Sequence, residues 1–384
     1  MIRALFLSAN VGVGHSSAAN AVCAALEDVA PENRGLVVDS YRYAAFVVSR
    51  VVSSGYLQMV KTIPQMYRYL YHRAERATEI GPFRTWAHQF TAANLRTLIE
   101  RERPDIVVCT HAFPFGAMAQ YKAAYADSPP ILGIVTDFAV HGFWVQEGVD
   151  GYVVATEALR AELVARGVPA ERVVAAGIPV HPRFSASEET RAALRMRLGL
   201  PQDRPIALLM GGGLGIGPLE RMIAAVEGTR TPVAAVAIAG RNGRIERRAL
   251  AAARKLGRPV RVLGFVENVY DYMHACDVLV TKPGGLTAAE ALAARIPLVL
   301  CSPLPGQEER NSRVLVEAGC AVRVRSLPDL SDALDTVLSD PERRAGMVAA
   351  AAKLGRPQAA REVAALIARL ARVSRAIVEK AGAA

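Results

Sequence analysis

The stretch TKPGGLTAAEALAARIPLVLCSPLPGQEERNS, residues 281–312, decides how the second half of this chain folds. It continues from an apolar run, residues 277–280, that is typical of a buried parallel strand. A Gly-Gly turn then leads into a helix, with Thr287 near its N-terminus and Glu290 three residues later. This order predicts an anion site, because backbone N–H groups and the positive end of the helix dipole point toward whatever binds there.

Glu290 lies one turn into the expected helix, where a carboxylate can accept two hydrogen bonds from a vicinal diol such as a ribose. A second strand, residues 297–301, leads to the polar turn PGQEERN, residues 305–311. A capping box followed by an ordinary loop is the alternative interpretation, since short motifs give many false positives. The whole stretch fits an anion site better than it fits capping alone.

The composition of the 384-residue chain is that of a globular protein with two domains or one large one. Hydrophobic residues make up 52%, which argues against disorder. We expect neither a signal peptide nor a membrane-spanning helix. The five cysteines form no C-x-x-C pair, which argues against a zinc or redox motif and suits a reducing cytosol. The net charge of +10 suits nucleic acid, an anionic membrane or an anionic substrate.

Two series of short apolar runs predict an α/β fold with two doubly wound domains. The expected strands of the first domain are residues 2–8, 35–40, 105–110, 131–136, 151–156 and 172–176. Those of the second are residues 206–210, 233–239, 260–263, 278–281, 298–301 and 321–324. A charged segment between the two series predicts a first domain over residues 1–183 and a second over residues 184–384, with Ala/Arg-rich helices at its end.

A loop with Gly12, Gly14 and His15 follows the first expected strand, and a helix is expected from Ser16. His15 is therefore expected at the carboxyl edge of a parallel sheet, where ligands bind in doubly wound folds. A neutral imidazole at this place is a candidate general base. A histidine that caps the helix is an equally good interpretation of this loop alone.

Other polar residues follow later strands of the first sheet: His111, Asp137 and His141. Each alone is more often structural, but parallel strands bring their carboxyl ends to one crevice. The second sheet begins similarly, because its first strand runs into GGGLGIG, residues 211–217. Five glycines in seven residues let the backbone approach a diphosphate closely, although the loop lacks the Lys-Ser/Thr of a P-loop.

Residues 41–90 differ from the rest of the chain because they interleave aromatic and basic side chains. Such a mixture suits a membrane interface, where rings lie at the headgroup level and cations meet anionic lipid. A helical insertion that packs its rings inward is the structural alternative. A platform for single-stranded nucleic acid would have a similar composition, but no nucleic-acid-binding module surrounds the segment.

The motifs together resemble glycosyltransferase family 28, whose GT-B architecture has two doubly wound Rossmann-like domains facing across a cleft. The donor-site motifs that carry the resemblance are TKPGGLT from residue 281 through Glu290, and PGQEE from residue 305 with Asn311. The motifs similar to monogalactosyldiacylglycerol synthases and processive diacylglycerol glucosyltransferases are Gly12-x-Gly14-His15, VTDF at residues 135–138 and GIPV at residues 177–180. Val13 stands where that subfamily usually has a glycine.

The resemblance implies that the second domain binds UDP-glucose or UDP-galactose as a co-substrate. The residues implied to hold the diphosphate, uracil, ribose and sugar are Gly213, Phe265, Val266, Gly285, Leu286, Thr287, Glu290, Gln307, Glu308 and Asn311. In the first domain it implies that the loop with Gly12 and Gly14 serves the acceptor, and that His15, or else Asp137, takes the acceptor proton. It also implies an inverting reaction with no cofactor and no metal, and the sequence contains no D-x-D motif.

The implied acceptor is diacylglycerol at the cytoplasmic face of the cell membrane, with residues 41–90 facing an anionic surface and no role for nucleic acid. The protein would then be a peripheral membrane enzyme. Three alternatives share parts of this pattern: N-acetylglucosaminyl transfer to a peptidoglycan lipid precursor, a UDP-sugar epimerase, and a non-catalytic UDP-sugar sensor on the membrane.

Overall fold

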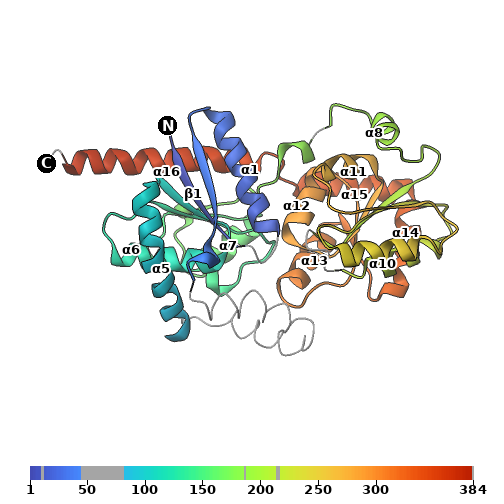
Figure 1. The fold of residues 1–384 in the computed structure, drawn as a ribbon, viewed down its shortest axis with the longest axis horizontal. Coiled ribbons are helices and arrows are strands. Elements are labelled where there is room, and N and C mark those ends of the chain that lie inside the picture. The colour runs from blue at the N-terminus through green and yellow to red at the C-terminus, as the bar shows by residue number, and fades with distance from the viewer. Residues whose placement is uncertain (10–12, 45–81, 186, 213–216, 383–384) are drawn as a thin grey trace. The chain divides into compact units, whose positions relative to one another are not determined.

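A computed structural model describes residues 1–9, 13–44, 82–185, 187–212 and 217–382 (Figure 1). The chain forms two compact units. Unit 1 consists of residues 1–180 and 358–384, and unit 2 of residues 181–357. Gly12, Gly213 and most of the expected insertion, residues 45–81, lie outside the described residues.

Unit 1 is built on a six-stranded parallel sheet in the order β2-β1-β3-β4-β5-β6. Its strands are β1 (Arg3–Ser8), β2 (Arg34–Asp39), β3 (Ile106–Cys109), β4 (Ile131–Ile134), β5 (Gly151–Val153) and β6 (Val173–Val174). Its helices are α1 (Val13–Val29), α5 (Pro82–Glu102), α6 (Ala112–Ala124), α7 (Glu157–Ala165) and α16 (Ala359–Gly382), with 3-10 turns η1 (Ser40–Arg42), η3 (Gly142–Trp144) and η4 (Ala170–Arg172). All six strands overlap the runs predicted for this sheet.

One face of this sheet is covered by the first and last helices of the chain. α16, the red helix of Figure 1, lies against α1, and both pack on the buried side chains of β1, β3 and β4. Val363 and Ile367 of α16 are fully buried in this core. The assignment of the final helix to the second domain is therefore corrected by the structure. Its apolar stripe completes the core of unit 1, whereas the expected boundary at residue 183 lies close to the observed one after Val180.

Unit 2 holds a second six-stranded parallel sheet, in the order β12-β11-β10-β7-β8-β9. Its strands are β7 (Ile206–Met210), β8 (Ala234–Ile238), β9 (Val260–Leu263), β10 (Val278–Thr281), β11 (Leu298–Leu300) and β12 (Ala321–Arg323). Its helices are α8 (Arg191–Arg197), α9 (Leu219–Glu227), α10 (Gly243–Ala253), α11 (Val269–Ala275), α12 (Gly285–Ala293), α13 (Gln307–Glu317), α14 (Leu330–Leu338) and α15 (Pro341–Leu354), with 3-10 turns η5 (Pro182–Phe184) and η6 (Leu327–Asp329). These strands also overlap the predicted runs.

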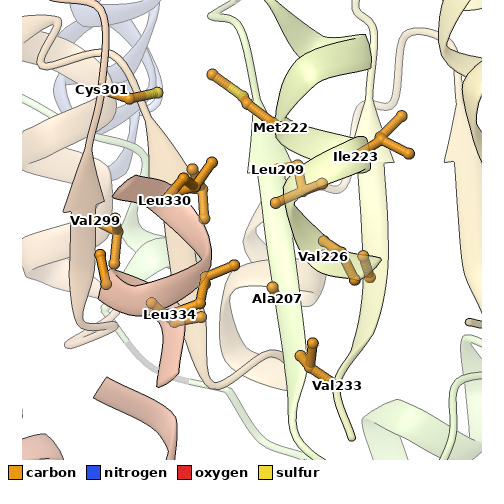
Figure 2. Close-up of a cluster of buried hydrophobic side chains, with 14 of the residues drawn as sticks. Ala207, Leu209, Met222, Ile223, Val226, Val233, Val299, Cys301, Leu330 and Leu334 are labelled. Atoms are coloured by element: carbon orange, nitrogen blue, oxygen red, sulfur yellow. The ribbon is translucent and has the colours of Figure 1, made fainter. Parts of the chain in front are cut away.

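The strands of unit 2 are apolar without alternation because both faces of a doubly wound sheet are covered. Every residue of β7 and β10 is buried. Figure 2 shows part of this core, a single cluster that includes Leu209 of β7, Met222 of α9, Val299 of β11, and Leu330 and Leu334 of α14. Full burial of each such side chain stabilises the fold by about 1.5–3 kcal/mol.

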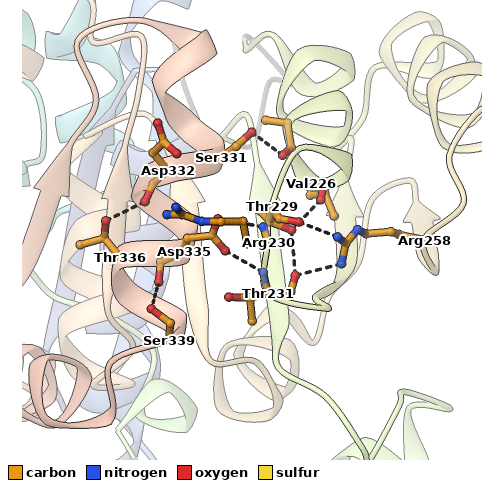
Figure 3. A network of polar contacts seen from close by, with 11 residues as sticks. Val226, Thr229, Arg230, Thr231, Arg258, Ser331, Asp332, Asp335, Thr336 and Ser339 are labelled. Atoms are coloured by element: carbon orange, nitrogen blue, oxygen red, sulfur yellow. Dashed lines mark hydrogen bonds and ion pairs between the residues drawn. The ribbon is translucent and has the colours of Figure 1, made fainter.

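A buried carboxylate ties α14 to the segment before β8 (Figure 3). Asp335 is 3% exposed, and its two oxygens accept hydrogen bonds from the backbone N–H groups of Arg230 and Thr231, each at 2.9 Å. Burial alone would raise the pKa of Asp335, but these bonds outweigh it and the pKa lies below its ordinary value. The carboxylate thus joins two elements at the amino edge of the sheet.

We expect Asp335→Ala to lower the free energy of unfolding of unit 2 by about 3 kcal/mol, because two backbone N–H groups lose their buried acceptor. Urea denaturation measures this change. The matched control is Asp332→Ala on the exposed face of the same helix, since only the backbone carbonyl of Asp332 binds Thr336. Because the folded pKa is depressed, the contribution of Asp335 is present above the unfolded pKa and is lost as the pH falls below about 4. Equal effects of the two substitutions would contradict this account.

Among the helices that the structure describes, none is long and apolar enough to cross a membrane.

Candidate functional site

The strand order places a topological switch point in unit 1 between β1 and β3. Chain connections leave these two neighbouring strands in opposite directions, and ligands bind at the carboxyl ends of such strands. α1 is the next element along the chain after β1, and it begins at Val13 rather than at the expected Ser16. His15 therefore lies in the first turn of the helix rather than in a loop, and Gly14 precedes it there.

His15 is held by the ends of two other strands. Its Nδ1 atom lies 2.9 Å from the carbonyl oxygen of Thr110, after β3, and 2.9 Å from the hydroxyl oxygen of Thr136, after β4. A carbonyl oxygen can only accept a hydrogen bond, so Nδ1 carries the proton and the hydroxyl of Thr136 is a second acceptor for it. The neutral ring then has its lone pair on Nε2, which is the state that a general base requires.

The environment of His15 favours this neutral state. Burial lowers its pKa below the ordinary value, and the hydrogen bond to Thr110 only partly opposes the change. Asp137, the second candidate base, directly follows Thr136 in the chain and is half-buried. The structure thus brings His15 and the segment with Asp137 to one edge of the sheet. Thr110 and Thr136 were missed as contacts of His15, although Thr136 lies within the VTDF motif.

Unit 2 has its own switch point, between β7 and β10. α12 follows β10, and its first backbone hydrogen bond runs from Ala288 N–H to Gly284 C=O. The N–H groups of Gly285, Leu286 and Thr287 precede that bond, so the helix leaves them for another acceptor. These are the residues predicted to meet the diphosphate.

The alternative interpretation of this stretch, a capping box at Thr287 and Glu290, is wrong. The helix begins two residues before Thr287, its N-cap is Gly284, and no side chain caps it. Thr287 and Glu290 are therefore both inside the helix, and Glu290 is free for another role. Its side chain is half-buried, and burial raises the pKa of its carboxyl group to about 8. A desolvated carboxyl with this pKa gains from a ligand that donates hydrogen bonds to it.

Three loops at this edge of unit 2 are joined by an ion pair that the sequence interpretation missed. Lys282, after β10, binds Glu308 of α13, whose other oxygen accepts the N–H of Leu304 at 2.8 Å. A Cβ atom on Gly212, after β7, would lie 3.2 Å from Cε of Lys282, and the φ angle of Gly212 is +78°. Only glycine suits such a position. The side chain of Glu308 is 8% exposed, so the residue predicted to bind sugar hydroxyls is occupied by Lys282 and Leu304 here.

Asn311 and Gln307 lie in the first turns of α13. Asn311 is fully buried, and its Nδ2 donates to the carbonyl of Pro283 at 3.0 Å. This bond holds the turn between β10 and α12 in place. Asn311 was predicted to support the part of the site that binds the diphosphate, and that role stays a prediction. Gln307 is half-buried at the start of the helix.

Phe265 and Val266 follow β9, at the edge of the sheet and two strands from β7. Phe265 is 42% exposed, and the guanidinium carbon of Arg241 lies 3.7 Å from the centre of its ring. A ring and a guanidinium stacked in this way present a flat surface at the carboxyl ends of β8 and β9. Arg241 was not predicted, and the GRN sequence after β8 was the available signal.

We expect Glu308→Ala to destabilise unit 2 by about 3 kcal/mol, because it leaves the half-buried Lys282 ammonium group without its partner. The double variant Lys282→Met with Glu308→Leu should regain at least about 1 kcal/mol, since an apolar pair needs no counter-charge. Thermal unfolding of both variants measures the difference. Glu100→Ala, which removes an exposed pair with Arg96, is the control and should show no measurable change. A double variant less stable than Glu308→Ala would refute the interpretation.

Comparison with known proteins gives the same division of the chain. Residues 15–180 match the family model of monogalactosyldiacylglycerol (MGDG) synthase, and residues 191–354 match that of glycosyl transferases group 1. A processive diacylglycerol beta-glucosyltransferase of Bacillus cytotoxicus is 28% identical over 362 residues, which cover 94% of this chain and 92% of the relative. One of Bacillus pumilus is 27% identical over 345 residues, 90% of this chain and 89% of the relative.

Solved structures share the fold at lower identity. MurG of Acinetobacter baumannii has a TM-score of 0.62 at 16% identity and covers 96% of this chain and 100% of its own. The MnaA–UDP structure from S. aureus has a TM-score of 0.64 at 15% identity, with 94% and 95% covered.

The two sheets and their strand orders give the chain a fold of the GT-B class, and both parts of the chain resemble glycosyltransferase families. Within this class, the matches confirm the resemblance to the family-28 subfamily of monogalactosyldiacylglycerol synthases and processive diacylglycerol glucosyltransferases.

Proposed function

We propose that this protein transfers a hexose from UDP-glucose or UDP-galactose to diacylglycerol, with inversion at the anomeric carbon and without a metal ion. The similarity to processive diacylglycerol glucosyltransferases along 94% of the chain supports the acceptor and the reaction type. One structural observation carries the chemistry: His15 is a neutral imidazole with a fixed tautomer at a topological switch point.

In the proposed step, the free hydroxyl of the acceptor attacks the anomeric carbon on the face opposite UDP. The new bond forms between the hydroxyl oxygen and that carbon, while the bond from the carbon to the phosphate oxygen breaks. The hydroxyl proton passes to Nε2 of His15, and UDP leaves with the electron pair. Asp137 is the alternative acceptor of the proton.

The residues proposed for the donor come from the segments that follow four strands of unit 2: β7, β9, β10 and β11. The N–H groups of Gly285, Leu286 and Thr287, with the loop that includes Gly213, stabilise the charge that develops on the diphosphate. The carboxylate of Glu290 accepts hydrogen bonds from the ribose diol. Gln307 and Glu308 bind sugar hydroxyls. Glu308 does so either beside its bond to Lys282 or in place of that bond. Phe265 and Val266 hold the uracil.

The function is tested by incubating the purified protein with diacylglycerol and, separately, with UDP-glucose, UDP-galactose and UDP-N-acetylglucosamine. Mass spectrometry of the lipids then gives the sugar and the number of sugars added. We expect a hexosyl diacylglycerol from one of the first two donors. Transfer only from UDP-N-acetylglucosamine, or UDP binding without any product, would support the rival enzyme or the non-catalytic sensor instead.

A diacylglycerol acceptor also implies a cellular location: the protein would be a peripheral enzyme at the cytoplasmic face of the cell membrane. The net charge of +10 and the aromatic and basic residues of segment 41–90 support this part of the proposal. Flotation with vesicles that contain anionic lipid tests it. We expect binding at low salt and release at high salt, and a protein that ignores the vesicles at low salt would overturn it.

A further inference from the structure

His111 lies beside His15, and its Nδ1 atom accepts a hydrogen bond where that of His15 donates one. It is the N-cap of α6, and its Nδ1 accepts the backbone N–H of Phe113 at 3.2 Å. A nitrogen that accepts this bond carries no proton, so the neutral ring has its proton on Nε2. Burial, with the neighbouring His15 and His141, lowers the pKa of His111 well below its ordinary value and keeps the ring neutral.

The two rings form a close pair at the switch point of unit 1. Their centroids are 4.9 Å apart and their planes are at 88°. Both side chains are half-buried, and neither Nε2 atom has a hydrogen-bond partner among the residues that the structure describes. His15 therefore offers an acceptor at Nε2, whereas His111 offers a donor at the same atom of its own ring.

Aromatic packing holds His111 in this orientation. The ring of Tyr41 stacks on Phe113 with centroids 5.3 Å apart, and it meets His111 edge-on at 6.0 Å. The hydroxyl of Tyr41 is buried and has no partner within the described part of the chain. A second polar group is thus available beside the pair, which is unusual for a purely structural cluster.

An adjacent acceptor and donor match an alcohol that has a carbonyl oxygen close to its hydroxyl. The hydroxyl donates its proton to one ring, and the carbonyl accepts from the other. Diacylglycerol has this arrangement, because its free hydroxyl lies on the carbon next to an ester-bearing carbon. A simple alcohol or an ether-linked lipid offers the hydroxyl without the carbonyl.

We propose that His111 is a further substrate-binding residue, whose Nε2–H donates a hydrogen bond to the ester carbonyl beside the acceptor hydroxyl while His15 takes the hydroxyl proton. This inference rests on the proposed function and adds to it a basis for recognising an ester-linked acceptor. A neutral hydrogen bond of this kind corresponds to about a 10-fold preference.

The test compares transfer to 1,2-diacylglycerol with transfer to 1,2-dialkylglycerol, which has the same free hydroxyl and no carbonyl. The variant is His111→Asn, because asparagine is a good N-cap and keeps an acceptor for Phe113, while its shorter amide has no donor at the position of the imidazole Nε2–H. Circular dichroism and UDP affinity check that the variant is folded. We expect the wild type to favour the diacyl acceptor by about 10-fold in kcat/KM, and His111→Asn to reduce this ratio to about 1.

A ratio that stays the same in His111→Asn would overturn the inference and leave the proposed function intact. A wild type that transfers to neither acceptor would instead refute the proposed function. Nitrogen-15 chemical shifts of the two rings give a readout that does not depend on turnover. We expect the Nδ1–H tautomer for His15 and the Nε2–H tautomer for His111, and the reverse assignment for His111 would also overturn the inference.

Discussion

His15→Ala is expected to lower the rate of hexose transfer by about 100-fold or more, which is the usual contribution of a general base. The reason is the fixed tautomer: with Nδ1 bound to Thr110 and Thr136, Nε2 is the atom that takes the acceptor proton. Initial rates with saturating UDP-sugar measure the loss. The affinity for UDP should not change, because the residues proposed to bind UDP lie in unit 2.

Asp137→Asn is the comparison that separates the two candidate bases. It preserves the size of the side chain but removes its charge, so it should affect kcat less than His15→Ala if His15 is the base. The pH profile adds a second criterion. Because the pKa of His15 is lowered, the wild type should keep its activity below pH 6.5, the ordinary value for histidine. Unchanged turnover in His15→Ala, with a large loss in Asp137→Asn, would transfer the role to Asp137.

Glu290→Gln is expected to have opposite effects on binding and on stability. Two hydrogen bonds from a ribose to a carboxylate become bonds to a neutral amide, so UDP affinity should fall by about 10-fold or more. The folded protein should become more stable at neutral pH. Burial raises the folded pKa of Glu290 to about 8, and the glutamate therefore opposes folding once it ionises. Calorimetric titration with UDP and thermal unfolding measure the two effects.

The raised pKa of Glu290 also makes the stability of the protein and its affinity for uridine depend on pH. Stability from the protonated carboxyl is fully present below pH 4.5, the ordinary value, and is lost as the pH rises toward about 8. A diol that donates to the carboxylate prefers the ionised form, so the affinity for uridine should rise with pH up to about 8. Uridine is the useful probe because it lacks phosphate groups that titrate near neutral pH. Neither trend should occur in Glu290→Gln.

Glu317→Gln is the matched control for Glu290→Gln, because it makes the same chemical change at an exposed position on α13. It should alter neither the unfolding temperature nor the affinity. Since about 1 kcal/mol shifts the unfolding temperature of a domain of this size by roughly 2–4 °C, the effect of Glu290→Gln is measurable. A loss of stability in Glu290→Gln at pH 8 would show that the carboxylate already has a stabilising partner.

The strands of both sheets were predictable from the sequence, because strands covered on both faces are continuous apolar runs such as IALLM in β7. The placement of His15, Asp137 and the α12 turn at strand ends followed from the same runs. The exact helix starts did not follow, since Gly284 caps α12 without any side chain. Threonine is a common N-cap residue, so the sequence favours a helix start at Thr287. The turn at Gly284 starts the helix earlier instead.

Contacts between distant segments were beyond the sequence. The bond from Asn311 to Pro283, and the pair of Lys282 with Glu308, depend on how β10 and β11 lie side by side. The tautomer of His15 likewise depends on Thr110, a residue 95 positions later whose type does not matter because its backbone makes the bond. The sequence also allowed α16 to pack on either unit, and its place against α1 is visible only in the structure.

The division of unit 1 between the two ends of the chain has a consequence for biosynthesis. The ribosome makes all of unit 2, residues 181–357, as one continuous segment before it makes α16. Until then the side of the first sheet that α16 covers is incomplete, and Val363 and Ile367 are missing from its core. Unit 1 can therefore complete its core only after all of unit 2 has been made, although most of unit 1 is synthesised first.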